Sequence, residues 1–203
     1  MKIFCIGRNY ADHAKELGNG IPDEPIIFMK PKSALVQGHT PFYFPEFTNE
    51  LNYEAELVVR ISKNGKYIQE KHASGYYNAI TVGIDFTARD IQNQLKEKGL
   101  PWEKSKSFDN SAAVGKFAEI TPKLDRKNIN FNFNKNKETV QTGNSSSMLF
   151  SIDAIVANIS NYFSLNIGDL VFTGTPAGVG ECMVGDLLEG YLEKDLVLSL
   201  EIK

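Results

Sequence analysis

Short runs of aliphatic, β-branched and aromatic residues, each flanked by turn-forming residues, limit most strongly what this chain can fold into. The clearest runs cover residues 57–61, 80–84, 170–173 and 196–202, and residues 1–7 form another at the N-terminus. Runs of this length and composition are typical of β-strands. Turn residues cluster beside them, as at residues 63–66 and 168–169. The sequence therefore predicts many short strands.

Helical patterns are fewer and cover residues 9–17, 90–98 and 152–163. In the last segment, apolar residues recur at the three- and four-residue spacing of one helix face. Because the strands do not alternate regularly with helices, a doubly wound α/β fold is not expected. The predicted fold class is α+β and mainly β, with a few short flanking helices, in one domain over residues 1–203.

Two further segments carry local predictions. Residues 18–25 are rich in Gly and Pro and are expected to form a mobile loop after the first helix. Residues 123–139 are rich in Asn and Lys around Ile129, Phe131 and Phe133. This alternation predicts an exposed β-hairpin.

Charge, hydropathy and cysteine content exclude several classes of protein. The formal net charge is −3 and there is no run of Lys or Arg, so nucleic acid is not an expected partner. No segment reaches the roughly 18 apolar residues that a membrane-spanning helix needs, so no membrane partner is expected. Cys5 and Cys182 form no CxxC motif or disulfide framework, which favours a reducing cytoplasm.

The pair Glu54 and Glu56 is the most informative local feature. Residues two apart in a strand point to the same face, so both carboxylates would lie side by side at the start of an apolar strand. Their repulsion would be relieved by a hard cation such as Mg²⁺, which prefers oxygen ligands. Paired acids on protein surfaces are common, however. The spacing alone therefore favours the alternative that both glutamates face water on an edge strand.

Asp85 strengthens the prediction of a metal site. It follows the apolar run 81–84, and a carboxylate at the end of a buried strand is well placed to line a cleft. The alternative is that Asp85 caps the helix that follows. Three carboxylates with no His or Cys close by in the sequence predict a hard metal and argue against zinc.

Three other side chains and one loop are candidates for chemistry. His13 and Glu16 are three residues apart, so on a helix they can face the same way, and Glu16 can orient His13 as a base. Taken alone, an exposed pair on a solvated helix face is the better interpretation, and Lys106 alone would be a surface lysine. Residues 174–180 form a Gly-rich loop that fails both nucleotide motifs, because Glu181 and Met183 stand where those motifs need other residues. Its backbone N–H groups could face an anionic ligand.

Read together, these segments resemble the fumarylacetoacetate hydrolase family, in its small single-domain branch of acylpyruvate hydrolases and oxaloacetate decarboxylases. The matching blocks are residues 7–16 (GRNYADHAKE), 28–31 (FMKP), 52–57 (NYEAEL), 83–90 (GIDFTARD), 104–109 (KSKSFD) and 174–180 (GTPAGVG). They occur in the family's order and cover nearly the whole chain.

The resemblance implies a fold, a cofactor and a set of site residues. The fold would be a mixed β-sandwich or β-roll, and the chain would form a homodimer. The metal, Mg²⁺ or Mn²⁺, would be held by Glu54, Glu56 and Asp85. The catalytic residues would be His13, Glu16 and Lys106, and the substrate-binding residues would be Arg8, Arg89, Gln92, Gln141, Gly174 and Thr175. Gln141 would begin a turn on the substrate side.

The expected function follows from the same resemblance. It is hydrolysis of the C–C bond of acylpyruvates, of the acetylpyruvate or fumarylpyruvate type, or decarboxylation of oxaloacetate, or both. Either reaction would pass through the enolate of pyruvate, stabilised by the metal and Lys106. One alternative is an isomerase or hydratase that acts on 2-oxo dicarboxylates. The other is a metal-binding protein without catalysis.

Overall fold

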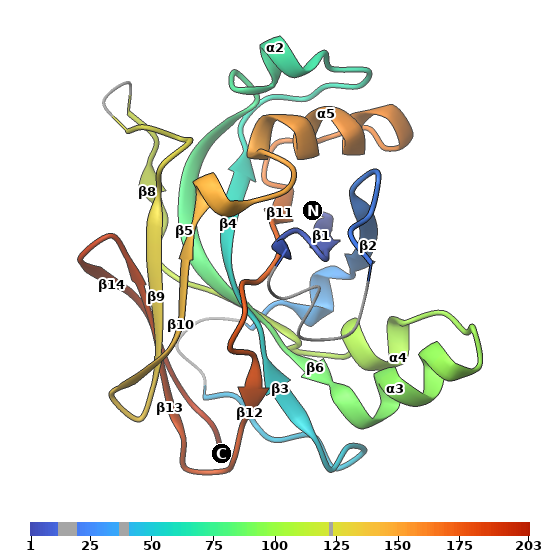
Figure 1. The fold of residues 1–203 in the computed structure, drawn as a ribbon, viewed down its shortest axis with the longest axis vertical. Helices are drawn as coiled ribbons and strands as arrows, with labels where there is room; N and C mark the ends of the chain where they lie inside the picture. Colours follow the sequence, from blue (N-terminus) through green and yellow to red (C-terminus); the bar gives the residue numbers. More distant parts are fainter. Residues whose placement is uncertain (12–19, 37–40, 122–123) are drawn as a thin grey trace.

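The computed structural model describes residues 1–11, 20–36, 41–121 and 124–203. Within these residues, β-strands form three sheets, and short helices lie at two opposite ends (Figure 1). The large sheet contains β1 (Ile3–Gly7), β2 (Ile26–Lys30), β4 (Ala55–Ile61), β5 (Tyr77–Asp85), β7 (Ala112–Val114), β8 (Ala118–Glu119) and β11 (Leu170–Phe172). Its strand order is β2-β1-β11-β4-β5-β7, with β8 also paired to β5. The pair β1–β11 is parallel and the other pairs are antiparallel.

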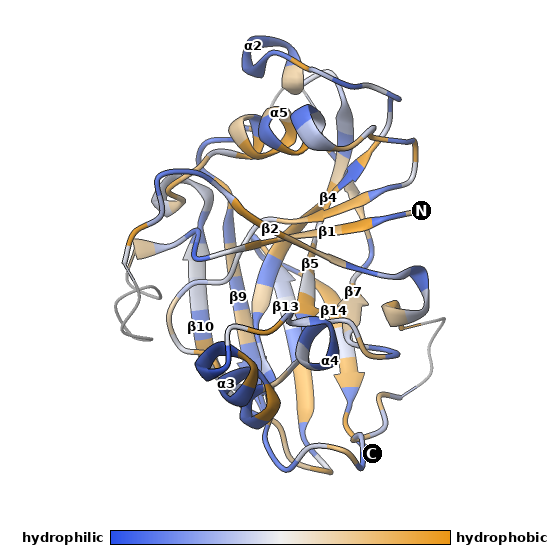
Figure 2. Ribbon diagram, turned by 90° about the vertical axis from the view of Figure 1, so that its right-hand side faces the viewer, coloured by the Kyte–Doolittle hydropathy of each residue, from blue (hydrophilic) through white to orange (hydrophobic). Residues whose placement is uncertain are grey.

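Both faces of the large sheet are covered, which explains why its strands are apolar without a break. In β1, Phe4 and Ile6 join the main core, whereas Ile3 and Cys5 join a smaller cluster on the opposite face. Side chains alternate between faces along a strand, so a strand buried on both sides needs apolar residues at successive positions. Figure 2 shows these strands as largely hydrophobic.

A second sheet packs against the first. It contains β9 (Asn130–Lys135), β10 (Glu138–Asn144), β13 (Leu187–Leu192) and β14 (Asp195–Glu201), in the order β10-β9-β13-β14. Gly190 of β13 lies against Val82 of β5, where an added Cβ would come within 3.0 Å of the valine Cγ1. The missing side chain lets the two backbones approach closely.

A small third sheet and the helices complete the described fold. The sheet pairs β12 (Gly180–Glu181), β3 (Leu51–Tyr53) and β6 (Thr87–Ala88). The α-helices are α2 (Glu70–Ala73), α3 (Arg89–Glu97), α4 (Glu103–Lys106) and α5 (Ile152–Tyr162), and 3₁₀ turns cover Lys32–Ala34 and Ser145–Ser147. Helix α3 is largely hydrophilic and lies with α4 beside β6 (Figures 1 and 2). No helix among the described residues is long and apolar enough to cross a membrane.

The predicted fold class is confirmed, and one local prediction needs correction. The predicted strands appear as β1, β4, β5, β11 and β14, and two predicted helices appear as α3 and α5. The hairpin exists as β9 and β10, but it is not exposed as a whole. Ile129, Phe131 and Phe133 are buried in the main core because one face of the hairpin covers the sheet. The predicted helix 9–17 and loop 18–25 extend into residues 12–19, which lie outside the described residues.

Candidate functional site

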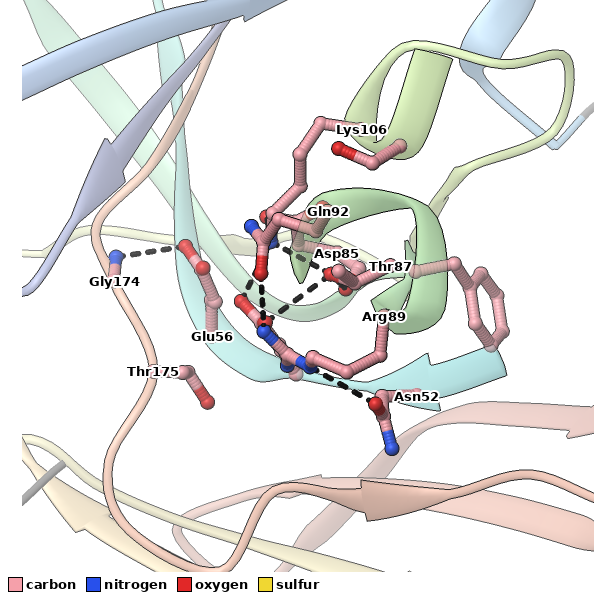
Figure 3. Close-up of polar contacts among 12 residues, drawn as sticks. Asn52, Glu56, Asp85, Thr87, Arg89, Gln92, Lys106, Gly174 and Thr175 are labelled. Atoms are coloured by element: carbon pink, nitrogen blue, oxygen red, sulfur yellow. Dashed lines mark hydrogen bonds and ion pairs between the residues drawn. The ribbon is translucent and has the colours of Figure 1, made fainter. Parts of the chain in front are cut away.

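Three carboxylates meet where β4 and β5 pair. Glu54 lies between β3 and β4, Glu56 is the second residue of β4, and Asp85 ends β5. Antiparallel pairing places Ala55 opposite Ile84, and the Asp85 backbone N–H donates to the Glu54 carbonyl at 2.9 Å. One ligand oxygen from each of Glu54, Glu56 and Asp85 lies within 4.8 Å of the others. Strand register therefore brings a sequence-distant aspartate to the glutamate pair, of which Glu56 is labelled with Asp85 in Figure 3.

The structure rules out both alternative interpretations of these carboxylates, namely a glutamate pair that faces water on an edge strand and an aspartate that caps the following helix. The exposed fractions of Glu54, Glu56 and Asp85 are 6%, 1% and 0%, and β4 is an interior strand between β11 and β5. Helix α3 has Ala88 at its N-cap position with no side-chain cap, so Asp85 does not cap it. Burial and the neighbouring Asp85 and Glu54 raise the pKa of Glu56 well above its ordinary value.

Lys106, from α4, lies directly beside two of the carboxylates. Its Nζ lies 2.8 Å from Glu54 Oε2 and 2.8 Å from Asp85 Oδ2, and it donates to Thr87 Oγ1 at 2.6 Å. Burial alone would lower the pKa of Lys106, but Asp85 and Glu54 outweigh burial and the pKa is raised. Lys106 is therefore a buried ammonium held against the carboxylates.

Arg89 and Gln92, both from α3, form one connected group with Glu54. Arg89 Nη2 lies 2.5 Å from Glu54 Oε1, Nη1 donates to Gln92 Oε1 at 2.6 Å, and Nε donates to Asn52 Oδ1 at 2.9 Å. The guanidinium thus has protein partners at all three nitrogens. We conclude that Arg89 orients Glu54 and Gln92. Figure 3 shows Arg89 with Gln92 and Asn52.

Lys30, the last residue of β2, is a site residue that the sequence reasoning did not select. Its side chain is fully buried, and its Nζ lies 2.8 Å from Asp85 Oδ1. The same ammonium donates to the Lys106 carbonyl and, at 3.0 Å each, to the Ser111 carbonyl and hydroxyl. Lys30 therefore both neutralises Asp85 and fixes the backbone that carries Lys106. Its only sequence signal was its place in the block 28–31.

The loop after β11 holds Glu56 through its backbone. The Gly174 N–H donates to Glu56 Oε2 at 2.7 Å. The sequence suggested that backbone N–H groups of this loop could face an anionic ligand, but the Gly174 N–H binds a carboxylate of the protein. Gly174 has φ +101°, and an added Cβ would lie 2.7 Å from the Asn9 Cβ. Only glycine fits this conformation and this close approach.

Thr175 and Gln141 connect that loop to β4. Thr175 Oγ1 donates to the Ala55 carbonyl at 2.8 Å, and Gln141 Oε1 accepts from the Ala55 N–H at 2.9 Å. Gln141 Nε2 donates to Thr175 Oγ1 and to the Pro176 carbonyl. Gln141 lies in strand β10, not in a turn, which corrects the expectation. Both atoms of its amide have protein partners, so we assign it a positioning role.

Arg8 follows β1 and lines the pocket above the carboxylates with Thr175, Lys106 and Lys96. It has φ 59°, a conformation that costs free energy in a residue other than glycine and often marks a functional site. The neighbouring Asn9 is fully buried and fixes this stretch, since its amide contacts the Thr173 and Phe150 carbonyls at 2.7 and 3.1 Å. The candidate catalytic pair His13 and Glu16 lies outside the described residues.

The comparisons with known proteins decide the family. The family model described as "Fumarylacetoacetate (FAA) hydrolase C-terminal" matches residues 2–202. The chain belongs to the fumarylacetoacetate hydrolase family.

Named relatives place the chain more closely within this family. It is 38% identical over 201 residues to a Bos taurus protein named oxaloacetate tautomerase FAHD1, mitochondrial, covering 99% of this chain and 90% of the relative. It is 39% identical over 189 residues to an oxaloacetate decarboxylase of Dictyostelium discoideum, covering 93% and 87%. The crystal structure of fumarylpyruvate hydrolase from Pseudomonas aeruginosa in complex with Mn²⁺ and pyruvate matches with a TM-score of 0.93 at 34% identity, covering 100% and 89%. The chain is an enzyme of the type that these relatives represent.

The residues present fit the divalent metal that this family implies. In an octahedral site with ligands about 2.1 Å from the ion, neighbouring oxygens are about 3 Å apart and opposite ones about 4.2 Å. The ligand oxygens of Glu54, Glu56 and Asp85 all lie within 4.8 Å of one another, so they need to close only slightly around an ion to reach that spacing. All three donors are carboxylate oxygens, the chemistry that Mg²⁺ and Mn²⁺ prefer.

Removal of Lys30 should reveal its part in this site. We expect Lys30→Met to lower the free energy of unfolding by about 3 kcal/mol, because it leaves the fully buried Asp85 with only one of its two cationic partners, Lys106. The measurement is urea unfolding of metal-free protein. Lys2→Met is the matched control: it also breaks a Lys–Asp pair, with Asp169, but Lys2 is partly exposed, so the loss should be smaller. Equal losses in the two variants would show that Lys30 is an ordinary structural residue.

Proposed function

We propose that this chain is a Mg²⁺- or Mn²⁺-dependent enzyme that breaks the C3–C4 bond of small 2-oxo acids, namely acylpyruvates and oxaloacetate. One observation supports this proposal: three buried carboxylates lie together, and the ammonium group of Lys106 contacts two of them. Hydrolysis of an acylpyruvate consumes water and gives a carboxylic acid and pyruvate. Decarboxylation of oxaloacetate gives CO₂ and pyruvate. In both reactions the electron pair of the broken bond is left on C3, as the enolate of pyruvate.

The protein groups have separate tasks in this proposal. When bound, the metal supplies a Lewis acid that polarises the carboxylate and 2-oxo oxygens of the substrate. Lys106 places a fixed positive charge beside the same position, where negative charge develops on oxygen as the bond breaks. Arg89 and the Gly174 N–H hold Glu54 and Glu56 in place, so they position ligands and do not touch substrate.

Water activation separates hydrolysis from decarboxylation. We propose that His13, oriented by Glu16, takes a proton from the water that attacks the C4 carbonyl of an acylpyruvate. Loss of CO₂ from oxaloacetate needs no such water. One site can therefore support both reactions with different demands on His13.

Tautomerisation is the second candidate, favoured by the Bos taurus relative named oxaloacetate tautomerase. Moving a proton between C3 and the 2-oxo oxygen breaks no C–C bond and passes through the enolate of oxaloacetate, whose 2-oxo oxygen carries the same developing negative charge as the enolate of pyruvate. A purely structural ion site is less well supported, because a structural ion has no need of a buried ammonium such as Lys106 beside its carboxylates. We further propose a homodimer and a reducing, cytoplasmic location, with Cys5 and Cys182 as free, buried thiols.

A substrate panel tests the proposed function. Oxaloacetate, acetylpyruvate and fumarylpyruvate are incubated with Mg²⁺, and pyruvate release is measured. We expect release from at least one substrate and its loss on chelation of the metal. Lys106→Met should lower kcat by about 10²–10³, the usual effect of losing one charge-stabilising donor. Lys104→Met is the control, because Lys104 is an exposed lysine of the same helix α4 and its loss should leave kcat unchanged. Turnover that survives chelation, or no release from any substrate, would refute the proposal.

His13→Ala should distinguish the two cleavage reactions. We expect kcat/KM for acylpyruvates to fall by about 10²–10⁴, the usual worth of a general base. Decarboxylation of oxaloacetate should fall much less. Glu16→Gln should follow the same pattern more weakly, because the imidazole remains. Equal losses on both substrates would show that His13 does not serve the water alone.

A further inference from the structure

Helix α3 carries a third polar residue on the face that bears Arg89 and Gln92. Residue 96 lies seven positions after Arg89 and four after Gln92, so Lys96 shares their side of the helix. Arg89 and Gln92 are buried next to the carboxylates, whereas Lys96 is only partly buried. It lines the same pocket as Glu54, Arg8 and Lys106. The face therefore runs from the carboxylates outward to Lys96.

The ammonium group of Lys96 makes no direct polar contact in the described part of the chain. Its ammonium forms no ion pair or hydrogen bond with any described residue, and its recorded contact is with the Trp102 ring, at 5.8 Å from the centroid. Burial and the nearby Arg89 lower its pKa, Glu54 acts in the opposite direction, and Lys106 and Arg8 add smaller effects that lower it further. Lys96 thus stands in a cationic surrounding that an anion would relieve.

A count of charges leads to the same conclusion. The three carboxylates of the site are matched by the three buried cations Lys30, Lys106 and Arg89. A divalent metal adds two positive charges, and Arg8 and Lys96 at the pocket wall add two more. A 2-oxo acid with one carboxylate would leave most of this charge unmatched, whereas a dicarboxylate would match more of it.

Lys96 lies about two helical turns beyond Arg89, which contacts Glu54. Arg89 and Lys96 are about 10 Å apart along α3 at a rise of about 1.5 Å per residue. Long side chains on a helix lean toward its N-terminus, and Lys96 lines the same pocket as Gln92. Trp102 and Phe28, whose ring centroids lie 6.0 Å apart, form an apolar wall of this pocket. An ion pair beside such a wall is less screened than one in water.

We propose that Lys96, with Arg8, binds a second carboxylate at the far end of the substrate. This contact selects dicarboxylic 2-oxo acids, such as oxaloacetate, over acylpyruvates that end in a methyl group. The inference rests on the proposed function for the reaction. It adds a residue of α3 that decides which member of the substrate class the site prefers.

Two ligands of equal length test the inference without turnover. Malate and 2-hydroxybutyrate differ only in ending with a carboxylate or a methyl group, and both can chelate a metal through the carboxylate and 2-hydroxyl. Binding of each is measured by calorimetry on Mn²⁺-loaded protein. We expect malate to bind more tightly than 2-hydroxybutyrate. Lys96→Gln should weaken the binding of malate by about 10- to 100-fold, the usual contribution of a hydrogen bond between charged groups. The affinity for 2-hydroxybutyrate should change by no more than about threefold.

Two further variants separate charge at this position from general damage. Lys98→Gln removes an exposed lysine close by in the same helix region and should leave both affinities unchanged. Lys96→Arg keeps the charge and should retain most of the preference for malate. The same pattern is expected in KM for oxaloacetate against acetylpyruvate, with kcat little changed.

The outcomes distinguish this inference from the proposed function. No preference for malate in the unmodified protein, or equal weakening of both ligands by Lys96→Gln, would overturn the inference whatever the enzyme catalyses. A Lys96-dependent preference for malate in a protein that releases no pyruvate would keep the inference and refute the proposed reaction.

Discussion

Three carboxylates can be buried together only if positive charge meets them, and the rest of this site follows from that constraint. The antiparallel register of β4 and β5 brings Glu54, Glu56 and Asp85 to one point. The cost of burying like charges is large, since neither water nor distance weakens their repulsion there. The fold offsets it with cations from elsewhere in the chain, of which Lys30 from β2 and Lys106 from α4 contact Asp85 directly.

The cations that balance the carboxylates also fix their geometry. Arg89 joins Glu54 to α3, and Lys30 joins Asp85 to the backbone of α4. On the opposite side, the Gly174 N–H holds Glu56, and glycine is required there because the backbone approaches Asn9 closely. All three carboxylates are therefore held by other parts of the chain before any ligand arrives, with Lys106 of α4 contacting both Glu54 and Asp85. Preorganisation of this kind reduces the rearrangement needed when a cation and a substrate bind.

The sequence predicted those parts of the site that depend on the geometry of a single strand. Alternation along a strand placed Glu54 and Glu56 together, and a carboxylate at the end of an apolar run identified Asp85. Lys30 could not be identified in this way, because its burial depends on contacts with residues 85, 106 and 111, all distant in sequence. Gln141 was expected in a turn but lies in β10, since tertiary pairing with β9 decides its conformation. Lys96 was not singled out, although its spacing from Arg89 and Gln92 was visible in the sequence.

Anomalous diffraction at the manganese edge, from crystals grown with Mn²⁺, tests the metal site most directly. We expect one strong peak with oxygens of Glu54, Glu56 and Asp85 at about 2.1–2.2 Å. Lys106 should remain next to the ion's ligands, facing the open side of the site. A peak at another position, or no peak at the three carboxylates with Lys106 still paired to Glu54 and Asp85 at saturating Mn²⁺, would contradict the assignment.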